Sequence, residues 1–253
     1  MKHILYIFTF LFCISLSAQN DALFDTANKS YNDGNFQVAI EKYESILNSG
    51  VHSSELYFNL GNAYYKVNRI APSIFYYEKA LQLSPNNSDY KSNLSFAKNM
   101  TIDDIEVVPE IGLSKIGKSI INVFNFDVWA TFSVVFVLVF VILFLGYYFS
   151  NATTKKRLAF IVSSSALVLA IISLFFAQQK YHFTINDKPA IVFVKETDIK
   201  TEPNLRSEVM FTLHEGTKVQ VLENYDENWT KIKLSDGKTG WIQIEDIKLL
   251  NNI

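Results

Sequence analysis

The pattern of apolar and polar residues changes twice along the chain and predicts three kinds of segment. In residues 19–100, small and aromatic residues recur at fixed offsets that suit packed helices. Two apolar runs without a charged residue follow, Ala130–Tyr148 and Leu158–Phe176. From Lys188 onward, apolar and polar residues alternate in short stretches separated by turn residues, which is typical of β-strands. We therefore expect a multidomain protein with an all-α region, two long apolar helices and a small all-β barrel.

The two apolar runs predict a pair of membrane-spanning helices. At about 1.5 Å per helical residue, each run is roughly 28–30 Å long, which matches the hydrocarbon thickness of a bilayer. Trp129 and the pair Tyr147-Tyr148 flank the first run, as aromatic residues do at membrane interfaces. Buried helices of a soluble protein are the alternative, which charge-free runs of this length disfavour.

The segment "SNATTKKR" between the runs is short, so the two helices should form an antiparallel hairpin. It carries Lys155, Lys156 and Arg157, and positive charge in short loops favours the cytoplasmic side of a membrane. The flanking residues 19–128 and 180–253 would then both lie on the outer, periplasmic side of a bacterial cytoplasmic membrane.

The N-terminal residues have the features of a signal peptide. Lys2 precedes the apolar run Ile4–Leu16, and Ser17-Ala18 supply small residues for cleavage. An uncleaved membrane anchor is the alternative, although the run is short for a span. Cys13 is the only cysteine, so a chain cleaved after Ala18 would have no disulfide and no cysteine metal site.

A short amphipathic helix is expected just before the first span. In "GLSKIGKSIINVFNF", Leu113, Ile116, Ile120 and Phe124 recur at helical spacing, which suits a helix on the outer membrane surface. A helix that packs on the N-terminal domain is the alternative. The acidic residues 103–106 that precede this stretch are expected to be a solvated linker.

The stretch "ANKSYNDGNFQVAIEKYESIL" from Ala27 aligns with "GNAYYKVNRIAPSIFYYEKAL" from Gly61, 34 residues later. The period and the residue types resemble the tetratricopeptide repeat, in which each unit is a pair of antiparallel helices. The resemblance implies that small residues let paired backbones approach and that aromatic residues fill the core. The small residues are Ala27, Ala39, Gly61 and Ser73, and the aromatic residues are Phe36, Tyr43, Tyr64 and Tyr77. Gly34 and Asn68 stand where the first helix of each pair would end in a left-handed conformation, and residues 88–99 resemble a terminal cap.

The tetratricopeptide resemblance places the partner-binding surface on the concave face, which the first helix of each pair forms. The candidate residues on this face are Phe24, Asn28, Tyr31, Asn59, Asn62 and Tyr65. Some members of that family hold a C-terminal carboxylate with paired asparagines and basic residues. Asn28 and Asn59 match the asparagines. Phe24, Asp89 and Asn93 occupy the basic positions, so we expect an apolar or amide-rich peptide ligand instead.

The C-terminal module resembles a bacterial SH3 domain. The matching features are Pro203, Leu213 with Gly216, Trp229 in "NWTKI", and Gly240-Trp241. Asp236-Gly237 favours a hairpin turn between two of its strands. Trp241 and Val221 are expected in the core, and Tyr225 with Trp229 is expected to face a ligand. Relatives of this module bind cell-wall peptides or proteins, and the sequence leaves both open.

No motif indicates an enzyme. The four histidines are scattered without metal-ligand spacing, and no phosphate-binding glycine loop or nucleophile motif is present. The formal net charge of −2 gives no electrostatic reason for nucleic-acid binding. We therefore expect a non-enzymatic protein without a cofactor or metal.

The order of the predicted segments resembles that of the BatE family of the bacterial aerotolerance operon. This order is signal peptide, tetratricopeptide repeats, membrane hairpin and SH3 module. The resemblance implies a link to stress tolerance, and it implies von Willebrand-type Bat proteins and a MoxR-type ATPase system as partners. One hypothesis is a membrane-anchored scaffold that binds partner proteins outside the cytoplasmic membrane. The other is a cell-wall sensor whose SH3 module binds peptidoglycan. The expected segments are 1–18 (signal peptide), 19–100 (repeats), 101–128 (linker with interfacial helix), 129–149 and 158–178 (spans), 150–157 (cytoplasmic loop) and 187–250 (SH3 module).

Overall fold

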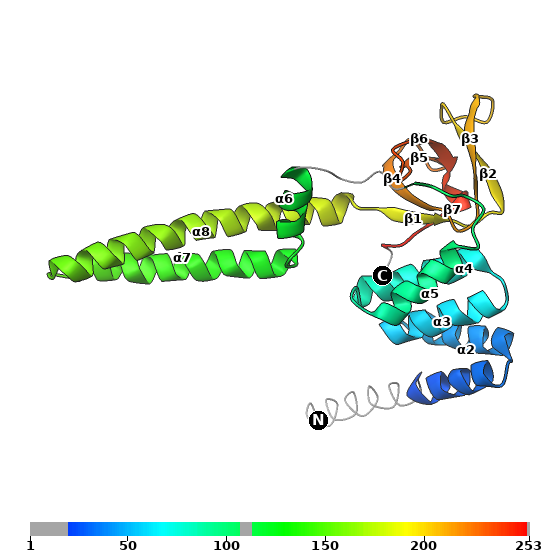
Figure 1. The fold of residues 1–253 in the computed structure, drawn as a ribbon, viewed down its shortest axis with the longest axis horizontal. Helices are drawn as coiled ribbons and strands as arrows, with labels where there is room; N and C mark the ends of the chain where they lie inside the picture. The colour runs from blue at the N-terminus through cyan, green and yellow to red at the C-terminus, as the bar shows by residue number, and fades with distance from the viewer. Residues whose placement is uncertain (1–19, 107–112, 252–253) are drawn as a thin grey trace, which may run out of the picture. The chain divides into compact units, whose positions relative to one another are not determined.

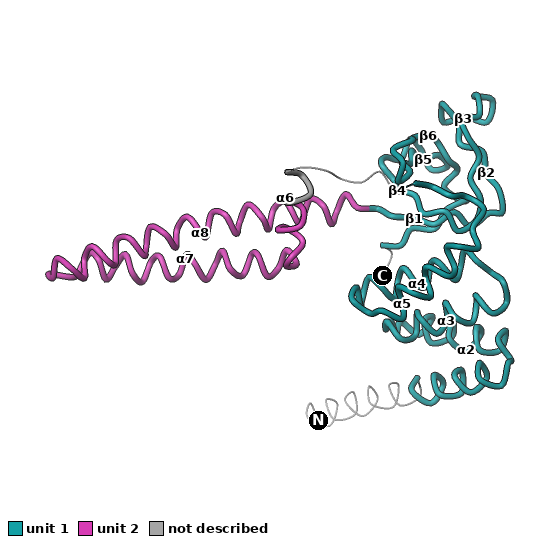
Figure 2. Tube along the Cα trace, in the orientation of Figure 1, with its two compact units in different colours: residues 1–107, 188–253 teal, residues 108–187 magenta. Residues whose placement is uncertain are grey.

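The computed structural model describes residues 20–106 and 113–251, which fall into two compact units (Figure 1, Figure 2). One unit joins residues 1–107 to residues 188–253, and the other comprises residues 108–187. The helical N-terminal region and the C-terminal sheet therefore belong to one compact unit. The predicted signal peptide, residues 1–18, lies outside the described residues.

The helical part of the first unit is a succession of short helices, each packed against the next. A helix over residues 20–32 precedes α2 (Phe36–Asn48), α3 (Ser54–Lys66), α4 (Ile70–Leu83) and α5 (Ser88–Lys98). Ser53 begins α3 because its side chain accepts a hydrogen bond from the backbone N–H of Leu56, and Asn87 caps α5 in the same way.

The turns that join the paired helices repeat the same geometry 34 residues apart. Gly34 has φ +80° and Asn68 has φ +58°, the left-handed conformation expected at both positions. The N–H after each residue bonds to the carbonyl five residues earlier, at 2.9 Å from Asn35 to Ser30 and at 3.0 Å from Arg69 to Tyr64.

The predicted close approach at Gly61 is confirmed. A Cβ atom at this position would lie 2.8 Å from Cδ1 of Tyr77. The Ser73 hydroxyl donates to the Gly61 carbonyl at 2.9 Å, so the small residues of α3 and α4 meet directly. Only glycine leaves room there for the Tyr77 ring.

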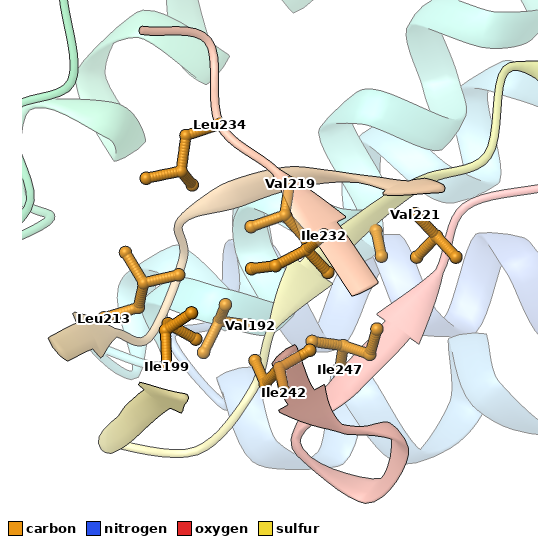
Figure 3. Close-up of a cluster of buried hydrophobic side chains, with 10 residues drawn as sticks. Val192, Ile199, Leu213, Val219, Val221, Ile232, Leu234, Ile242 and Ile247 are labelled. Carbon is orange, nitrogen blue, oxygen red and sulfur yellow. The ribbon is translucent and has the colours of Figure 1, made fainter. Parts of the chain in front are cut away.

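The C-terminal part of the first unit is an antiparallel sheet, whose order is β3-β2-β6-β5-β4-β1-β7. Its strands are β1 (Pro189–Val192), β2 (Glu196–Lys200), β3 (Val209–His214), β4 (Lys218–Asn224), β5 (Trp229–Lys233), β6 (Thr239–Gln243) and β7 (Ile247–Leu249), with a 3-10 turn η1 (Ile244–Asp246) before β7. Aliphatic side chains from most of these strands converge in one core, including Val192, Ile199, Ile232 and Ile242 (Figure 3). Among the described residues no strand pairing joins β3 to β7, so the hydrogen-bonded sheet is open where a closed barrel was expected.

The second unit contains α6 (Leu113–Ile121), α7 (Phe126–Phe149) and α8 (Thr153–Asn186). By length and composition, α7 and α8 could each cross a membrane. Small residues of α8 are buried in the pair, namely Ser163, Ala166, Ala170, Ser173 and Ala177. The Ser133 hydroxyl of α7 donates to the Ala170 carbonyl at 3.1 Å, so the two backbones lie close together, as in membrane helix pairs.

The helix α8 is longer than the predicted second span. It begins at Thr153 and ends at Asn186, so it takes up most of the predicted loop 150–157 and adds a turn or more beyond residue 178. Residues 155–157 are Lys-Lys-Arg, which favour helix, and this explains why the helix starts within the predicted loop. The Lys180 side chain donates to Asn122 Oδ1 at 2.7 Å and thus ties α8 to the turn after α6.

Candidate binding groove

A polar network built on Asn28 lines the inner face of the helical repeats. Asn28 Oδ1 accepts a hydrogen bond from the Tyr43 hydroxyl at 2.6 Å and another from Asn59 Nδ2 at 3.0 Å. The three residues come from three successive helices, so the network fixes their spacing.

The same network recurs one repeat later around Asn62. Asn62 Oδ1 accepts from the Tyr77 hydroxyl at 2.6 Å and from Asn93 Nδ2 at 2.8 Å. The side-chain oxygen of each asparagine thus accepts two hydrogen bonds from within the repeats. Among the described residues, Nδ2 of Asn28 and of Asn62 has no hydrogen-bond partner, so two amide groups one repeat apart remain as donors.

Two adjoining cavities open over these networks. The first has a volume of about 290 Å³ and the second about 270 Å³, and Tyr31 and Asn62 line both. The first is also lined by Asn28, Asn32, Tyr43 and Asn59, and the second by Tyr65, Lys66, Tyr77, Asn93 and Phe96. Five of the six candidate residues on this face therefore lie together. Amides and tyrosines dominate the lining, and among the described residues that form it Lys66 is the charged one.

The tyrosines of the network are neutral hydrogen-bond donors. Burial raises the pKa of Tyr43 to about 12, and burial also raises the pKa of Tyr77. Both hydroxyls therefore keep their protons at physiological pH and donate to the asparagine oxygens. The asparagine amides are in turn held with their N–H groups available to a ligand.

Phe24 is the candidate residue that lies elsewhere. It packs against the buried cluster that contains Tyr43, with their ring centroids 5.9 Å apart, and it does not line either cavity. Phe24 lies one turn before Asn28 on the same face of the helix, but its ring packs on Tyr43 and so belongs to the core instead of the cavity lining.

The structure corrects the assignment of the two tryptophans in the sheet. Trp229, expected to face a ligand, is only 7% exposed, and its backbone N–H bonds to Asp226 Oδ1 at 2.7 Å. Trp241, expected in the core, is half-buried and stands edge-to-face with Tyr225 at 5.8 Å. Trp241 pairs with Lys231 across the ladder, and its neighbour Ile242 points into the core instead. The surface aromatic pair of the sheet is therefore Tyr225 with Trp241.

The helical repeats and the sheet share a buried contact. Ile191 of β1 and Leu250 pack in one cluster with Ile70 and Ile74 of α4. Beside it, Glu78 of α4 accepts hydrogen bonds from Lys98 at 2.9 Å and from Lys218 of β4 at 2.7 Å. Burial opposes the charge of Glu78, but the two ammonium groups outweigh it and lower the pKa of this carboxyl.

The acidic stretch after α5 is part of this contact and not a solvated linker. Asp103 Oδ2 accepts from the backbone N–H of His214 at 2.7 Å and from the Thr217 hydroxyl at 2.6 Å. Its Oδ1 lies 2.7 Å from His214 Nδ1. Ile105, two residues on, packs against the core of the sheet. Residues 101–106 therefore fasten the end of the helical repeats to the turn between β3 and β4.

Sequence reasoning missed Asn93, Tyr77 and Phe96 as groove residues. The tetratricopeptide resemblance places Asn93 at a position that is basic in some family members, and it places Tyr77 in the core. The 34-residue repeat contained the signal, because Asn59 and Tyr43 shifted by one period are Asn93 and Tyr77.

These features define a chain of helical repeats and an SH3-type sheet, together with two helices apolar enough to cross a membrane. Comparison with known families finds a tetratricopeptide repeat at residues 54–87, which covers α3 and α4, and a bacterial SH3 domain at residues 195–247, which covers β2 to β6 and the start of β7. Both are typically binding modules without catalytic activity, with proteins or the cell wall as ligands. The comparison with curated proteins found no match.

Proposed function

We propose that this protein is a non-enzymatic, membrane-anchored scaffold whose groove holds an extended segment of a partner protein. The observation that carries the proposal is the repeated network, which presents the amide groups of Asn28 and Asn62 one repeat apart. Amide N–H groups recognise backbone carbonyls, which every peptide carries. Tyr31, Tyr65 and Phe96 add apolar area beside them, and tyrosine suits an interface anchor because its ring is apolar and its tip is polar.

The cellular setting is the second part of the proposal. The helices α7 and α8 would anchor the chain, with the Lys155–Arg157 stretch on the cytoplasmic side and the first unit in the periplasm. A BatE-like role would make von Willebrand-type Bat proteins and a MoxR-type ATPase system the partners. The order of repeats, apolar hairpin and SH3 module supports this role.

The groove can be tested without breaking its network. Asn62→Asp keeps the oxygen that accepts from Tyr77 and Asn93, but it replaces the free amide with a carboxylate oxygen. A photocrosslinking residue in place of Phe96, which is exposed and lines the second cavity, would capture a segment bound there. We expect Asn62→Asp to lower the yield of partner adduct about five- to tenfold, the worth of one hydrogen bond.

The matched control is Asn86→Asp, which adds the same charge at an exposed position outside the groove. It should leave the adduct yield unchanged. Equal adduct from wild type and from Asn62→Asp would contradict the groove as the binding site.

A cell-wall sensor is the second candidate function, which the surface pair Tyr225 and Trp241 favours. Lys231 lies 5.6 Å from the Trp241 ring centroid, so an aromatic platform and a cation stand together. Such a platform suits the sugar and peptide parts of peptidoglycan. If this aromatic pair binds cell wall, the full chain should sediment with purified peptidoglycan in detergent, and the Trp241→Ala variant should not. Failure of the wild type to sediment would contradict the cell-wall function and leave the scaffold as the remaining proposal.

A further inference from the structure

A cavity of about 300 Å³ lies within the second unit, where α7 ends and α8 begins. It is lined by Tyr147, Thr153, Lys156, Arg157 and Phe160. Two cations and a hydroxyl thus share a cavity with two aromatic rings. Neither the repeats nor the sheet contribute to it, so the groove function does not account for it.

The positive charge of this cavity is uncompensated. The sequence from Val128 to Asn186 contains no aspartate or glutamate. Among the described residues, Lys155, Lys156 and Arg157 take part in no ion pair. The Lys156 ammonium lies 5.4 Å from the Tyr147 ring centroid, a cation–π contact that holds the charge at the cavity. The cavity therefore presents ordered cations without an internal anion.

The aromatic part of the cavity lining, Tyr147 and Phe160, continues into the apolar surfaces of the helices. The Tyr147 ring lies 5.6 Å from Phe160 and 5.8 Å from Phe144. Tyr148 and Phe149 beside them are 70% and 74% exposed. Exposed aromatic rings at the end of an apolar helix are typical of the membrane–water interface. A ligand that fits this site needs an anionic head for the cations and an apolar tail for the rings.

We propose that the cavity binds the headgroup of an anionic phospholipid. Lys156 and Arg157 contact its phosphate, Thr153 donates a hydrogen bond to it, and an acyl chain lies along Phe160 and Phe144. A free phosphate ion would use the cations and leave the aromatic walls without a partner. This inference rests on the membrane insertion of α7 and α8 proposed above, and the cytoplasmic leaflet is rich in anionic lipids.

The test uses the full-length protein in nanodiscs that contain phosphatidylglycerol and phosphatidylcholine. After gentle release into detergent, native mass spectrometry counts the phosphatidylglycerol retained per protein. Lys156→Gln is compared with Lys155→Gln, which removes the same charge from a neighbour that does not line the cavity. We expect Lys156→Gln to reduce retention about fivefold, the effect of one cation near a phosphate. Lys155→Gln should stay within about twofold of wild type.

The outcomes separate this site from the membrane proposal. Failure of the wild type to enter nanodiscs would overturn both. Entry followed by equal retention of the two lipids, or equal losses in the two variants, would overturn the site alone. Competition by inorganic phosphate at low millimolar concentration would show that the site recognises the ion and not the lipid, and would also overturn the proposal.

Discussion

At the scale of single residues, Asp103 shows how one side chain can fasten a connecting segment to a folded module. Burial disfavours its charged form, but hydrogen bonds from Thr217 and His214 outweigh this and lower the pKa of the carboxyl below its ordinary value of 3.8. A carboxylate that accepts three hydrogen bonds is therefore bound in its charged state. The folded protein takes up a proton at this site only at a pH below that at which the unfolded chain does.

This lowered pKa predicts a pH-dependent contribution to stability. The contribution of Asp103 to stability is fully present above the ordinary pKa of 3.8, which the unfolded chain has, and is lost as the pH falls through the lower folded value. Asp103→Asn should cost about 1–3 kcal/mol at pH 7, because the Thr217 and His214 donors lose their charged acceptor. The difference between wild type and variant should shrink towards pH 2–3. Urea unfolding of the full chain in detergent, followed by tryptophan fluorescence, measures it.

The control is Asp104→Asn, an exposed neighbour that forms no hydrogen bond among the described residues. It should change the free energy of unfolding by less than about 0.5 kcal/mol at either pH. A cost for Asp103→Asn that is the same at pH 7 and at pH 3 would show that the charge of Asp103 is not what holds the segment.

A second prediction at this scale concerns two glycines with the same backbone conformation. Gly216 has φ +89° and Gly237 has φ +92°, so alanine is strained equally at both. A Cβ atom at Gly216 would lie 2.7 Å from Cγ2 of Thr101 and 3.0 Å from Cδ1 of Ile74, whereas one at Gly237 would meet nothing within 4 Å. Gly216→Ala should therefore destabilise the unit by about 1–3 kcal/mol more than Gly237→Ala. Chemical denaturation of both variants measures the difference. Equal losses of stability would mean that the turn at Gly216 is not packed tightly against α4.

At the scale of elements, residues 101–106 act as a strap between the helical repeats and the sheet. Thr101 contacts the turn at Gly216, Asp103 bonds to His214, and Ile105 covers part of the core of the sheet. Within the first unit, the sheet is thus completed by a segment more than 80 residues away in the sequence. We expect an SH3 module cut out at residues 187–250 to be less stable than the intact unit for this reason.

The strap can be tested with two isoleucines that lie three residues apart. Ile105 packs on the core, whereas Ile102 is 72% exposed. Ile105→Ala should lower the free energy of unfolding by about 1–2 kcal/mol, less than for a fully buried isoleucine. Ile102→Ala removes the same atoms from the surface and should change it by less than about 0.5 kcal/mol. Similar values for the two variants in urea unfolding would show that the strap adds no packing.

At the scale of the whole molecule, the sequence predicts local features of the structure but not its long-range contacts. The 34-residue period led to the turns at Gly34 and Asn68 and to the close approach at Gly61, because each depends on residues of one repeat. The contact of Asp103 with His214 spans 111 residues, and no local pattern marks it. Aspartate is common in loops, and His214 is the last residue of β3, so neither position indicates the other as its partner.

The sheet shows a second reason why part of the structure could not be predicted from the sequence. Alternation predicts that Trp241 and Ile242 face opposite sides of β6, but not which side is the core. In the β5–β6 ladder Trp241 pairs with Lys231, and the next residue, Ile242, lies in the core with Ile232. In the groove, five of the six candidate residues line the two cavities, because the repeat defines which helix face is concave. Their hydrogen bonds required side-chain geometry.

The membrane orientation of the chain is the last prediction, and it depends on the charge of the hairpin connection. Positive residues resist transfer across the cytoplasmic membrane, so Lys155, Lys156 and Arg157 should hold the end of the hairpin inside while both flanking regions lie outside. In a Cys13→Ser background, single cysteines are placed at Asn151 and at Glu227, an exposed position beside the turn that Asp226 caps. A membrane-impermeant thiol reagent should label Glu227→Cys in intact cells and Asn151→Cys only after detergent lysis. Lysed cells, where both sites must react, show that each cysteine is reachable. Labelling of Asn151→Cys but not of Glu227→Cys in intact cells would show the opposite orientation, with the groove in the cytoplasm. Labelling of neither would place the whole chain inside.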